Sequence, residues 1–566
     1  MKRIFTLVFL LVFLIVMPFL APRFVESWGA WSIIPPIVAI TLAFVTKNVV
    51  VSLFIGVFSG AYLIVLHTGP RLSAIVRAFI LMTQEMVSAL SDSWNAGIVV
   101  QTLTIGGLIA LVAVMGGTRA IAEKLSKSAR SAAAAQIYTW LMGIFIFFDD
   151  YANLLTVGPI MRPVTDKLRV SREKLAFIID STAAPIADIA LISTWIGYEL
   201  GLIRQGYAAI GVEANAYSVF IHTIPYRFYS LLILAFIFIS AKSRRDFGPM
   251  LTAERRARRE GKVYADGASI MSAVDTEKLA VADTTKLKVS NALVPVMTLI
   301  FGAFAALFYN GYQAILSGND AAQVALVTSG FSFAVLRECF SASNASIALT
   351  QAAIFASLVA IFMGWRQKIY SLKNAVDTWI KGAGGMVITV TILILAWSLS
   401  GVIGKLGTAE FLVGVISGKV PPFLLSTIIF VMGALISFAT GTSYGTMGIL
   451  MPLAVPLAFA VSQEPAFMYM NIGAVLTGAI FGDHCSPISD TTILSSMGAG
   501  CDHLAHVNTQ LGYALPVAGI SIVLCFIPTS LGLPVIVSLL TGAACVTGMI
   551  FLFGRHAEEK ARDRKS

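Results

Sequence analysis

Residues 474–500 read AVLTGAIFGDHCSPISDTTILSSMGAG, and this stretch decides which fold the chain can adopt. An apolar run leads directly into two acids, a histidine and two serines, and apolar residues follow at once. In a membrane such groups are costly unless they face one another or a wet cavity. Pro487 removes a backbone donor, so a helix is expected to break here and free backbone groups for an ion. The stretch is therefore interpreted as half of an ion-binding site, with Asp483, Ser486, Ser489 and Asp490 as candidate ligands.

Residues 180–193, DSTAAPIADIALIS, repeat part of this pattern earlier in the chain. Pro185 and Asp188 align without a gap with Pro487 and Asp490, and the residue that follows each proline is isoleucine in both copies. Because paired broken segments in corresponding halves mark the binding sites of transporters, the repetition points to such a site.

A second echo lies upstream of each copy. Tyr151 and Pro159 in the first half correspond to Tyr444 and Pro452 in the second half, and the two residues of each pair are eight positions apart. Two matched pairs in one order indicate a duplicated structural unit.

Bulk composition identifies an integral membrane protein. The 566 residues are 57% hydrophobic and 12% charged, with a mean hydropathy of +0.83. Apolar runs recur along the whole length and give about 12–14 hydrophobic segments. They are helical in type, since the alternating pattern of a barrel strand does not occur. The net charge of +10 lies between apolar runs, as the positive-inside rule expects, so no nucleic-acid partner is predicted.

The charge pattern also divides the chain and places both termini in the cytoplasm. Residues 4–21 could be a cleaved signal peptide, although the lack of a small-x-small cleavage site favours an uncleaved helix. The basic linker is expected to be a solvated tether, with binding of lipid headgroups as the alternative. The predicted divisions are N-terminal transmembrane helices at 1–70, a first repeat at 71–241, a basic cytoplasmic linker at 242–288, scaffold helices at 289–370, a second repeat at 371–553 and a cytoplasmic tail at 554–566.

Two hairpin tips supply further candidates. The first tip is acidic and follows an apolar run, whereas its counterpart in the second half carries hydroxyls and no charge. Together they would form a set of hard oxygen ligands suited to sodium. The alternative is that the acidic pair caps a hairpin at the membrane surface. The candidates are Asp149, Asp150 and Asn153 in the first tip and Thr442, Ser443 and Thr446 in the second.

Four acids flank the two predicted breaks: Asp180, Asp188, Asp483 and Asp490. At least two are expected to contact a transported ion. They could instead cap the broken half-helices, and the two roles are compatible because a helix N-terminus attracts a carboxylate and leaves one oxygen free. Opposed like charges would also let one carboxylate exchange a proton for a cation.

Histidine and cysteine leave alternatives open. His484 could sense protons, or it could be a neutral histidine held by hydrogen bonds. The run from Cys501 to His506 superficially offers zinc ligands, but without a second matched ligand pair a polar turn is favoured. No phosphate-binding loop of the Walker type occurs, so direct drive by ATP is unsupported.

The run from Gly482 to Ser496, with Asp502, His503, His506 and the Thr509–Tyr513 segment downstream, resembles the signature of the NhaC family of sodium/proton antiporters. The resemblance covers roughly residues 32–550. It implies two inverted repeats, each with a re-entrant hairpin and an interrupted helix, an elevator-like movement and commonly a homodimer. By motif it supports Asp483, Ser486 and Asp490, and through the repeat Asp180 and Asp188.

These observations predict an all-α integral membrane protein with two inverted repeats, re-entrant hairpins and interrupted helices. The expected function is secondary transport that exchanges sodium for protons across the bacterial inner membrane by alternating access, with no cofactor. Sodium, protons, membrane lipid and a second copy of the chain are the expected partners. Because the family also contains carriers of organic anions and amino acids, a coupled carrier of a small organic solute is the alternative. A channel needs no titratable site, and an enzyme is disfavoured because the acids lack a nucleophile–base pair or a metal set.

Overall fold

The computed structural model describes residues 28–46, 48–68, 73–126, 129–147, 149–269, 288–318, 321–408, 411 and 421–558. The predicted first segment at 4–21, residues 270–287 of the predicted linker and residues 559–566 of the predicted tail lie outside the described residues. The chain forms two compact units. Unit 1 comprises 1–111, 194–224 and 294–479, and unit 2 comprises 112–193, 225–293 and 480–566.

The predicted all-α architecture is confirmed. The sheet in the described part of the chain is one antiparallel pair of two-residue strands, β1 (Arg245–Asp246) and β2 (Arg555–His556). Within the described residues, eleven helices are long and apolar enough to cross a membrane, or twelve if a bent pair counts as one span. The protein is therefore a multi-pass membrane protein.

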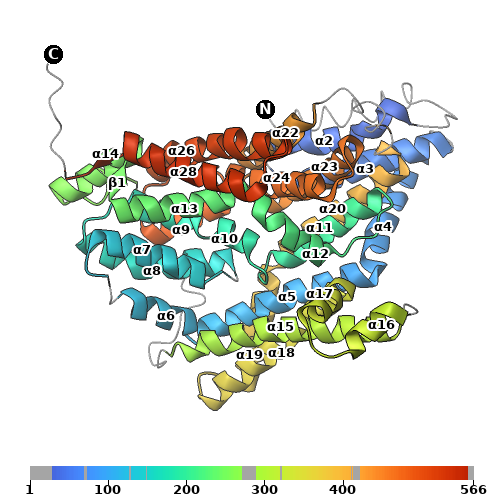
Figure 1. Cartoon of the computed structure of the whole chain (residues 1–566), viewed down its shortest axis with the longest axis horizontal. Helices are drawn as coiled ribbons and strands as arrows, with labels where there is room; N and C mark the ends of the chain where they lie inside the picture. Colours follow the sequence, from blue (N-terminus) through green and yellow to red (C-terminus); the bar gives the residue numbers. More distant parts are fainter. Residues whose placement is uncertain are drawn as a thin grey trace. The chain divides into compact units, whose positions relative to one another are not determined.

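Unit 1 holds most of the long apolar helices. They are drawn in Figure 1 in sequence colours. Helices α5, α15 and α24 begin in one unit and end in the other. The elements of unit 1, with these three, are η1 (Gly29–Ile33), α2 (Ile34–Thr46), α3 (Val49–Thr68), α4 (Ala74–Ser91), α5 (Ser93–Val114), α11 (Ile196–Ala209), α12 (Ala216–Thr223), α15 (Ser290–Leu316), α16 (Ala321–Thr328), α17 (Phe333–Ala342), α18 (Ala345–Arg366), α19 (Leu372–Gly385), α20 (Val387–Lys405), α22 (Pro422–Thr440), α23 (Ser443–Val461) and α24 (Pro465–His484).

Unit 2 holds shorter and more polar helices. Besides β1 and β2 its elements are α6 (Gly117–Ser126), α7 (Ala132–Phe145), α8 (Asp150–Lys167), α9 (Arg172–Ser181), α10 (Ala184–Ile189), α13 (Phe228–Ser243), α14 (Gly248–Arg255), the π-helical turn η4 (Arg256–Glu260), α25 (Asp490–Ala499), α26 (His503–Ile520), the π-helical turn η6 (Ser521–Phe526), α27 (Ile527–Ser530) and α28 (Val535–Phe553). The 3-10 turn η3 (Ile224–Tyr226) lies at the boundary between the units.

Both predicted interruptions are present. Helix α24 ends at His484 and α25 begins at Asp490, so Pro487 lies inside the break. In the first copy α9 ends at Ser181 and α10 begins at Ala184, so that break precedes Pro185. Pro185 stands in the first turn of α10, where a missing backbone N–H costs little.

The predicted hairpins differ in length. In the first, α7 and α8 lie side by side (Figure 1), and α7 has 14 residues, or about 21 Å. That is shorter than the ~30 Å apolar core of a bilayer, as a re-entrant hairpin requires. In the second, α22 and α23 have 19 residues each, and Gly441 makes the turn with a φ of +69°. The second tip lies where the sequence predicts it.

Candidate ion-binding site

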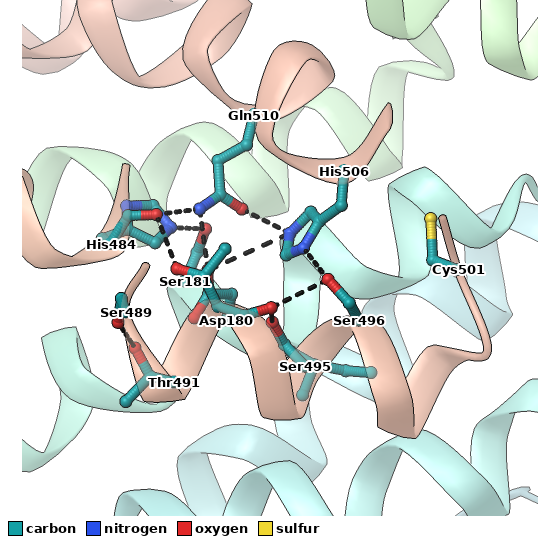
Figure 2. Close-up of polar contacts among 12 residues, drawn as sticks. Asp180, Ser181, His484, Ser489, Thr491, Ser495, Ser496, Cys501, His506 and Gln510 are labelled. Atoms are coloured by element: carbon teal, nitrogen blue, oxygen red, sulfur yellow. Dashed lines mark hydrogen bonds and ion pairs between the residues drawn. The ribbon is translucent and has the colours of Figure 1, made fainter. Parts of the chain in front are cut away.

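Asp180 is the carboxylate around which the polar side chains of unit 2 gather. It stands near the end of α9 and is 1% exposed. The Gln510 side chain, from α26, donates from Nε2 to Asp180 Oδ2 over 2.7 Å and also donates to the carbonyl of His484. The Thr492 hydroxyl on α25 is a further hydrogen-bond partner of Asp180. Figure 2 shows Asp180, Gln510 and His506 pointing toward one another. Three separate helices therefore position one buried carboxylate.

The two interrupted helices of unit 2 meet at their broken ends. Ser181 Oγ, the last residue of α9, lies 2.8 Å from Nε2 of His484, the last residue of α24. His484 Nδ1 lies 2.8 Å from the hydroxyl of Tyr229 on α13. His484 is buried and both of its ring nitrogens are engaged by hydroxyls. This arrangement gives the second of the two interpretations of His484, a histidine held in place by hydrogen bonds, a structural basis.

A chain of hydrogen bonds continues from Asp180 toward Pro487. Gln510 Nε2 donates to Asp180 and to the His484 carbonyl, so the oxygen of the same amide faces His506. Gln510 Oε1 accepts from Nε2 of His506 over 2.8 Å. His506 Nδ1 and His503 Nδ1 both approach Ser496 Oγ, at 2.9 and 3.0 Å. His503 Nε2 donates to the Pro487 carbonyl over 2.7 Å. The polar chain therefore fixes the shape of the second break.

The segment from Cys501 to His506 is part of this hydrogen-bond network. Asp502 is the N-cap of α26 and accepts from the Ala505 N–H over 2.9 Å. Cys501 Sγ points to the Asp502 carbonyl, at 3.3 Å. Among the residues that the structure describes, no group of three His, Cys, Asp or Glu side chains is arranged to hold a metal ion.

The predicted ligands of the second copy lie at and within the break between α24 and α25. The charges of Asp483 and Asp490 both act on Asp180. Asp483 is buried, whereas Asp490 is exposed at the start of α25, where its Oδ1 accepts from the Thr491 N–H over 2.9 Å. Ser486 and Ser489 lie in the break and are fully buried.

Asp188 has a different environment from the other three acids. Arg227 Nη1 lies 2.5 Å from Asp188 Oδ1 and also donates to the Asp188 carbonyl, and Ser230 donates to Oδ2 over 2.9 Å. All three side chains are fully buried. Both carboxylate oxygens are thus engaged by donors from the start of α13.

The first hairpin tip packs on the first break. Asp149 and Asp150 are each 3% exposed at the start of α8, so they are not at an open surface. Asn153 Nδ2 donates to the carbonyl of Gly143 on α7, over 3.0 Å, and to that of Thr182 in the break, over 2.8 Å. The buried Oδ1 of Asn153 has no hydrogen-bond partner. The Asn153 side chain therefore leaves one oxygen available as an acceptor or ligand between the first tip and the first break.

The second hairpin tip belongs to unit 1. Thr442 caps α23. The Tyr444 ring lies against those of Trp195, the N-cap of α11, and Tyr198 within α11, with ring centroids 4.8 and 4.6 Å apart. The hydroxyls of Ser443 and Thr446 point to backbone carbonyls of the same unit. A meeting of these hydroxyls with the acids of the first tip stays a prediction.

Sequence reasoning did not assign roles to several residues of the site. Gln510 lies in the Thr509–Tyr513 segment that the family signature contains, so the motif itself marked it. Arg227 is the one Arg, Lys, Asp or Glu between residues 214 and 241, and an isolated charge in an apolar segment needs a partner. Ser181, Tyr229 and Ser230 carried no comparable signal, because isolated hydroxyls are common in apolar helices.

A model of the Na+/H+ antiporter family matches residues 186–527, more than half of the chain and the whole second interrupted segment. The chain belongs to the Na+/H+ antiporter family. The resemblance to NhaC is thereby confirmed, and membership supports a transporter.

Individual relatives extend this family match. An uncharacterized protein of Haemophilus influenzae is 33% identical over 495 residues, which cover 87% of this chain and 89% of the relative. The malate-2H(+)/Na(+)-lactate antiporter of Bacillus subtilis is 33% identical over 179 residues, and the Na(+)/H(+) antiporter NhaC of Alkalihalophilus pseudofirmus is 29% identical over 178 residues. Each of these two alignments covers 31% of this chain and 36% of the named antiporter.

Comparison with solved structures supports the fold. The YdaH transporter of Alcanivorax borkumensis superposes with a TM-score of 0.51 at 13% identity, over 85% of this chain and 89% of that one. At this identity the likeness concerns the fold alone, which is that of a membrane transporter.

Proposed function

We propose that this antiporter-family protein exchanges sodium ions for protons by alternating access, with Asp180 as the central carboxylate. The observation that carries the proposal is the meeting of two interrupted helices at a buried acid, where Gln510 holds one Asp180 oxygen and two further acids lie in electrostatic range. A cation and a proton compete for the same carboxylate oxygens, so binding of one displaces the other. No cofactor is required beyond the two transported ions.

The oxygen ligands follow from the same geometry. Asp180 and Asp483 supply buried carboxylates, Ser486 and Ser489 supply hydroxyls in the break, and the Asn153 Oδ1 atom supplies an amide oxygen with no other partner. Backbone carbonyls freed at a break are further ligands in transporters. We assign Asp149 and Asp150 to the same region as a negative field that attracts cations, and Asp188 to the support of Arg227.

Placement in the cell follows from charge. From the basic linker and tail we infer that both termini face the cytoplasm of a bacterial cell, with the helices in the inner membrane. A homodimer in contact with membrane lipid is proposed from the family resemblance alone.

The test is sodium-driven proton flux in proteoliposomes that contain the purified full-length protein. An inward sodium gradient should alkalinise the lumen and an outward sodium gradient should acidify it, because each sodium ion that crosses is exchanged for protons moving the other way. The flux should saturate in sodium, and potassium should not substitute. Absence of sodium-dependent proton movement in the wild type, with the protein correctly inserted, would rule the proposal out.

A second candidate is sodium- and proton-coupled exchange of small organic acids. It is favoured by the relative whose name gives it malate, lactate, protons and sodium as substrates, aligned with 31% of this chain. The same proteoliposomes separate the two candidates. Uptake of labelled malate or lactate that requires sodium would support the second, and proton flux without any organic acid supports the first.

A further inference from the structure

The chain passes between its two units at five places, and two of these differ from the rest. The passages at 111/112, 293/294 and 479/480 lie inside the continuous helices α5, α15 and α24. The passage at 193/194 lies in the non-helical segment 190–195, and the passage at 224/225 lies where the α12–η3 segment meets α13 at an angle of 49°. Irregular backbone is where a moving protein absorbs changes in φ and ψ.

The ion pair of Asp188 and Arg227 lies beside both irregular passages. Asp188 is on α10, directly before the segment 190–195, and Ser193 Oγ donates back to the Ala187 carbonyl over 3.0 Å. Arg227 is the N-cap of α13, directly after η3. Two segments that leave unit 2 are therefore joined on the unit 2 side by one buried pair.

Several contacts hold Asp188 and Arg227 together. Arg227 contacts both the carboxylate and the backbone carbonyl of Asp188, and Ser230 occupies the second carboxylate oxygen. The start of α13 also places the positive end of a helix dipole at this acid. Separating two fully buried charges would leave each without compensation, which is far more costly than keeping them together.

We propose that Arg227 is a positioning residue that ties the two irregular passages together through Asp188, so that both change conformation as one during transport. Asp188 then serves as the counter-ion of Arg227 and does not bind the transported cation. The transport part of this proposal rests on the proposed exchange function, whereas the structural part does not.

The first test measures amide hydrogen exchange of the full-length protein in lipid nanodiscs. Arg227→Gln should speed exchange in 224–228 and also in 190–195, the passage on the other side of the pair. The matched control is Arg204→Gln, which breaks the Asp92–Arg204 pair inside unit 1 and should leave 190–195 unchanged. Unchanged exchange at 190–195 in the Arg227 variant would overturn the proposal, whether or not the protein transports sodium.

The second test compares single and double neutral variants in proteoliposomes. Asp188→Asn and Arg227→Gln should each lower the maximal rate by about tenfold with a sodium KM within about twofold of the wild type. The double variant should recover to within about threefold, because no uncompensated buried charge remains. Arg227→Lys should keep more activity than Arg227→Gln.

The opposite pattern would identify Asp188 as an ion ligand. In that case Asp188→Asn would raise the sodium KM, and the double variant would stay as impaired as this single variant. A wild type without sodium-driven proton flux would refute the exchange function. The hydrogen-exchange measurement would then test by itself whether Arg227 couples the two irregular passages.

Discussion

The two interrupted segments of unit 2 carry the same Pro-Ile-x-Asp pattern in different settings. Asp188 stands in the last turn of the six-residue helix α10, fully buried and bound to Arg227. Asp490 is the first residue of α25 and is exposed. The break lies before Pro185 in the first copy and around Pro487 in the second. A shared pattern thus places an interruption in each half, but the donor that faces the acid decides what the acid does.

The largest effect is expected at the acid that the shared pattern does not contain. In the gapless alignment Asp180 matches Gly482, so the first copy supplies a carboxylate where the second has none. Asp180→Asn keeps an oxygen for the Gln510 donor but removes the charge that binds a cation. Sodium-driven proton flux in proteoliposomes should fall by about 100-fold or more.

The control for this variant is Asp166→Asn in the same unit. Asp166 pairs with Arg172 at 3.0 Å and is partly exposed, so its loss should change flux by no more than about twofold. Flux that survives in Asp180→Asn, with normal insertion, would remove Asp180 from the site and return the central role to the aligned pair of acids.

The second prediction compares the aligned acids directly. Asp188→Ala leaves the Arg227 charge buried without its partner and should lower the free energy of unfolding by about 3–5 kcal/mol. Asp490→Ala removes a charge from the first turn of α25 and should cost only about 0.5–1 kcal/mol. Denaturant unfolding in detergent measures both. Equal losses would mean that the two acids have equivalent environments after all.

Sequence reasoning reached the class of fold and the location of the breaks, because hydropathy and proline chemistry act locally. Pro487 interrupts its helix through its own missing N–H, and no distant residue is needed to predict that. The pairing of Asp188 with Arg227 could not be predicted from the repeat, because the second copy has no arginine at the position that corresponds to Arg227. Gln510 was marked by the motif, but its contact with Asp180 depends on how α26 packs on α9.

The third prediction extends the comparison to the two hairpin tips. Asn153→Ala leaves two buried carbonyls, those of Gly143 and Thr182, without their donor and should cost about 2–3 kcal/mol of unfolding free energy. Tyr198→Phe removes one hydrogen bond to the Tyr444 carbonyl at the second tip and should cost about 1 kcal/mol. A larger loss in the tyrosine variant would show that the second tip, rather than the first, is the more tightly held.

The smallest effect is expected where an Asp–Arg pair is half-exposed. Asp92 lies between the spans α4 and α5, and Arg204 contacts its two oxygens at 2.7 and 3.2 Å. The hydrogen bond from Arg204 lowers the pKa of Asp92 below its usual value. Solvent screening at this exposure limits the pair to under about 1 kcal/mol at neutral pH, against the larger value expected for the buried pair of Asp188.

The sign of the pH dependence separates this pair from a general loss of packing. Because the folded-state pKa of Asp92 is lowered, its contribution is fully present above the unfolded value of about 3.9 and disappears as the pH falls through the folded value. Unfolding free energies of the wild type and Asp92→Asn should therefore differ at pH 7 and converge as the pH falls below the folded-state pKa of Asp92. A difference that persists in acid would have to come from contacts of the Asp92 side chain other than its charge, such as its acceptance of the Trp94 and Asn95 N–H groups.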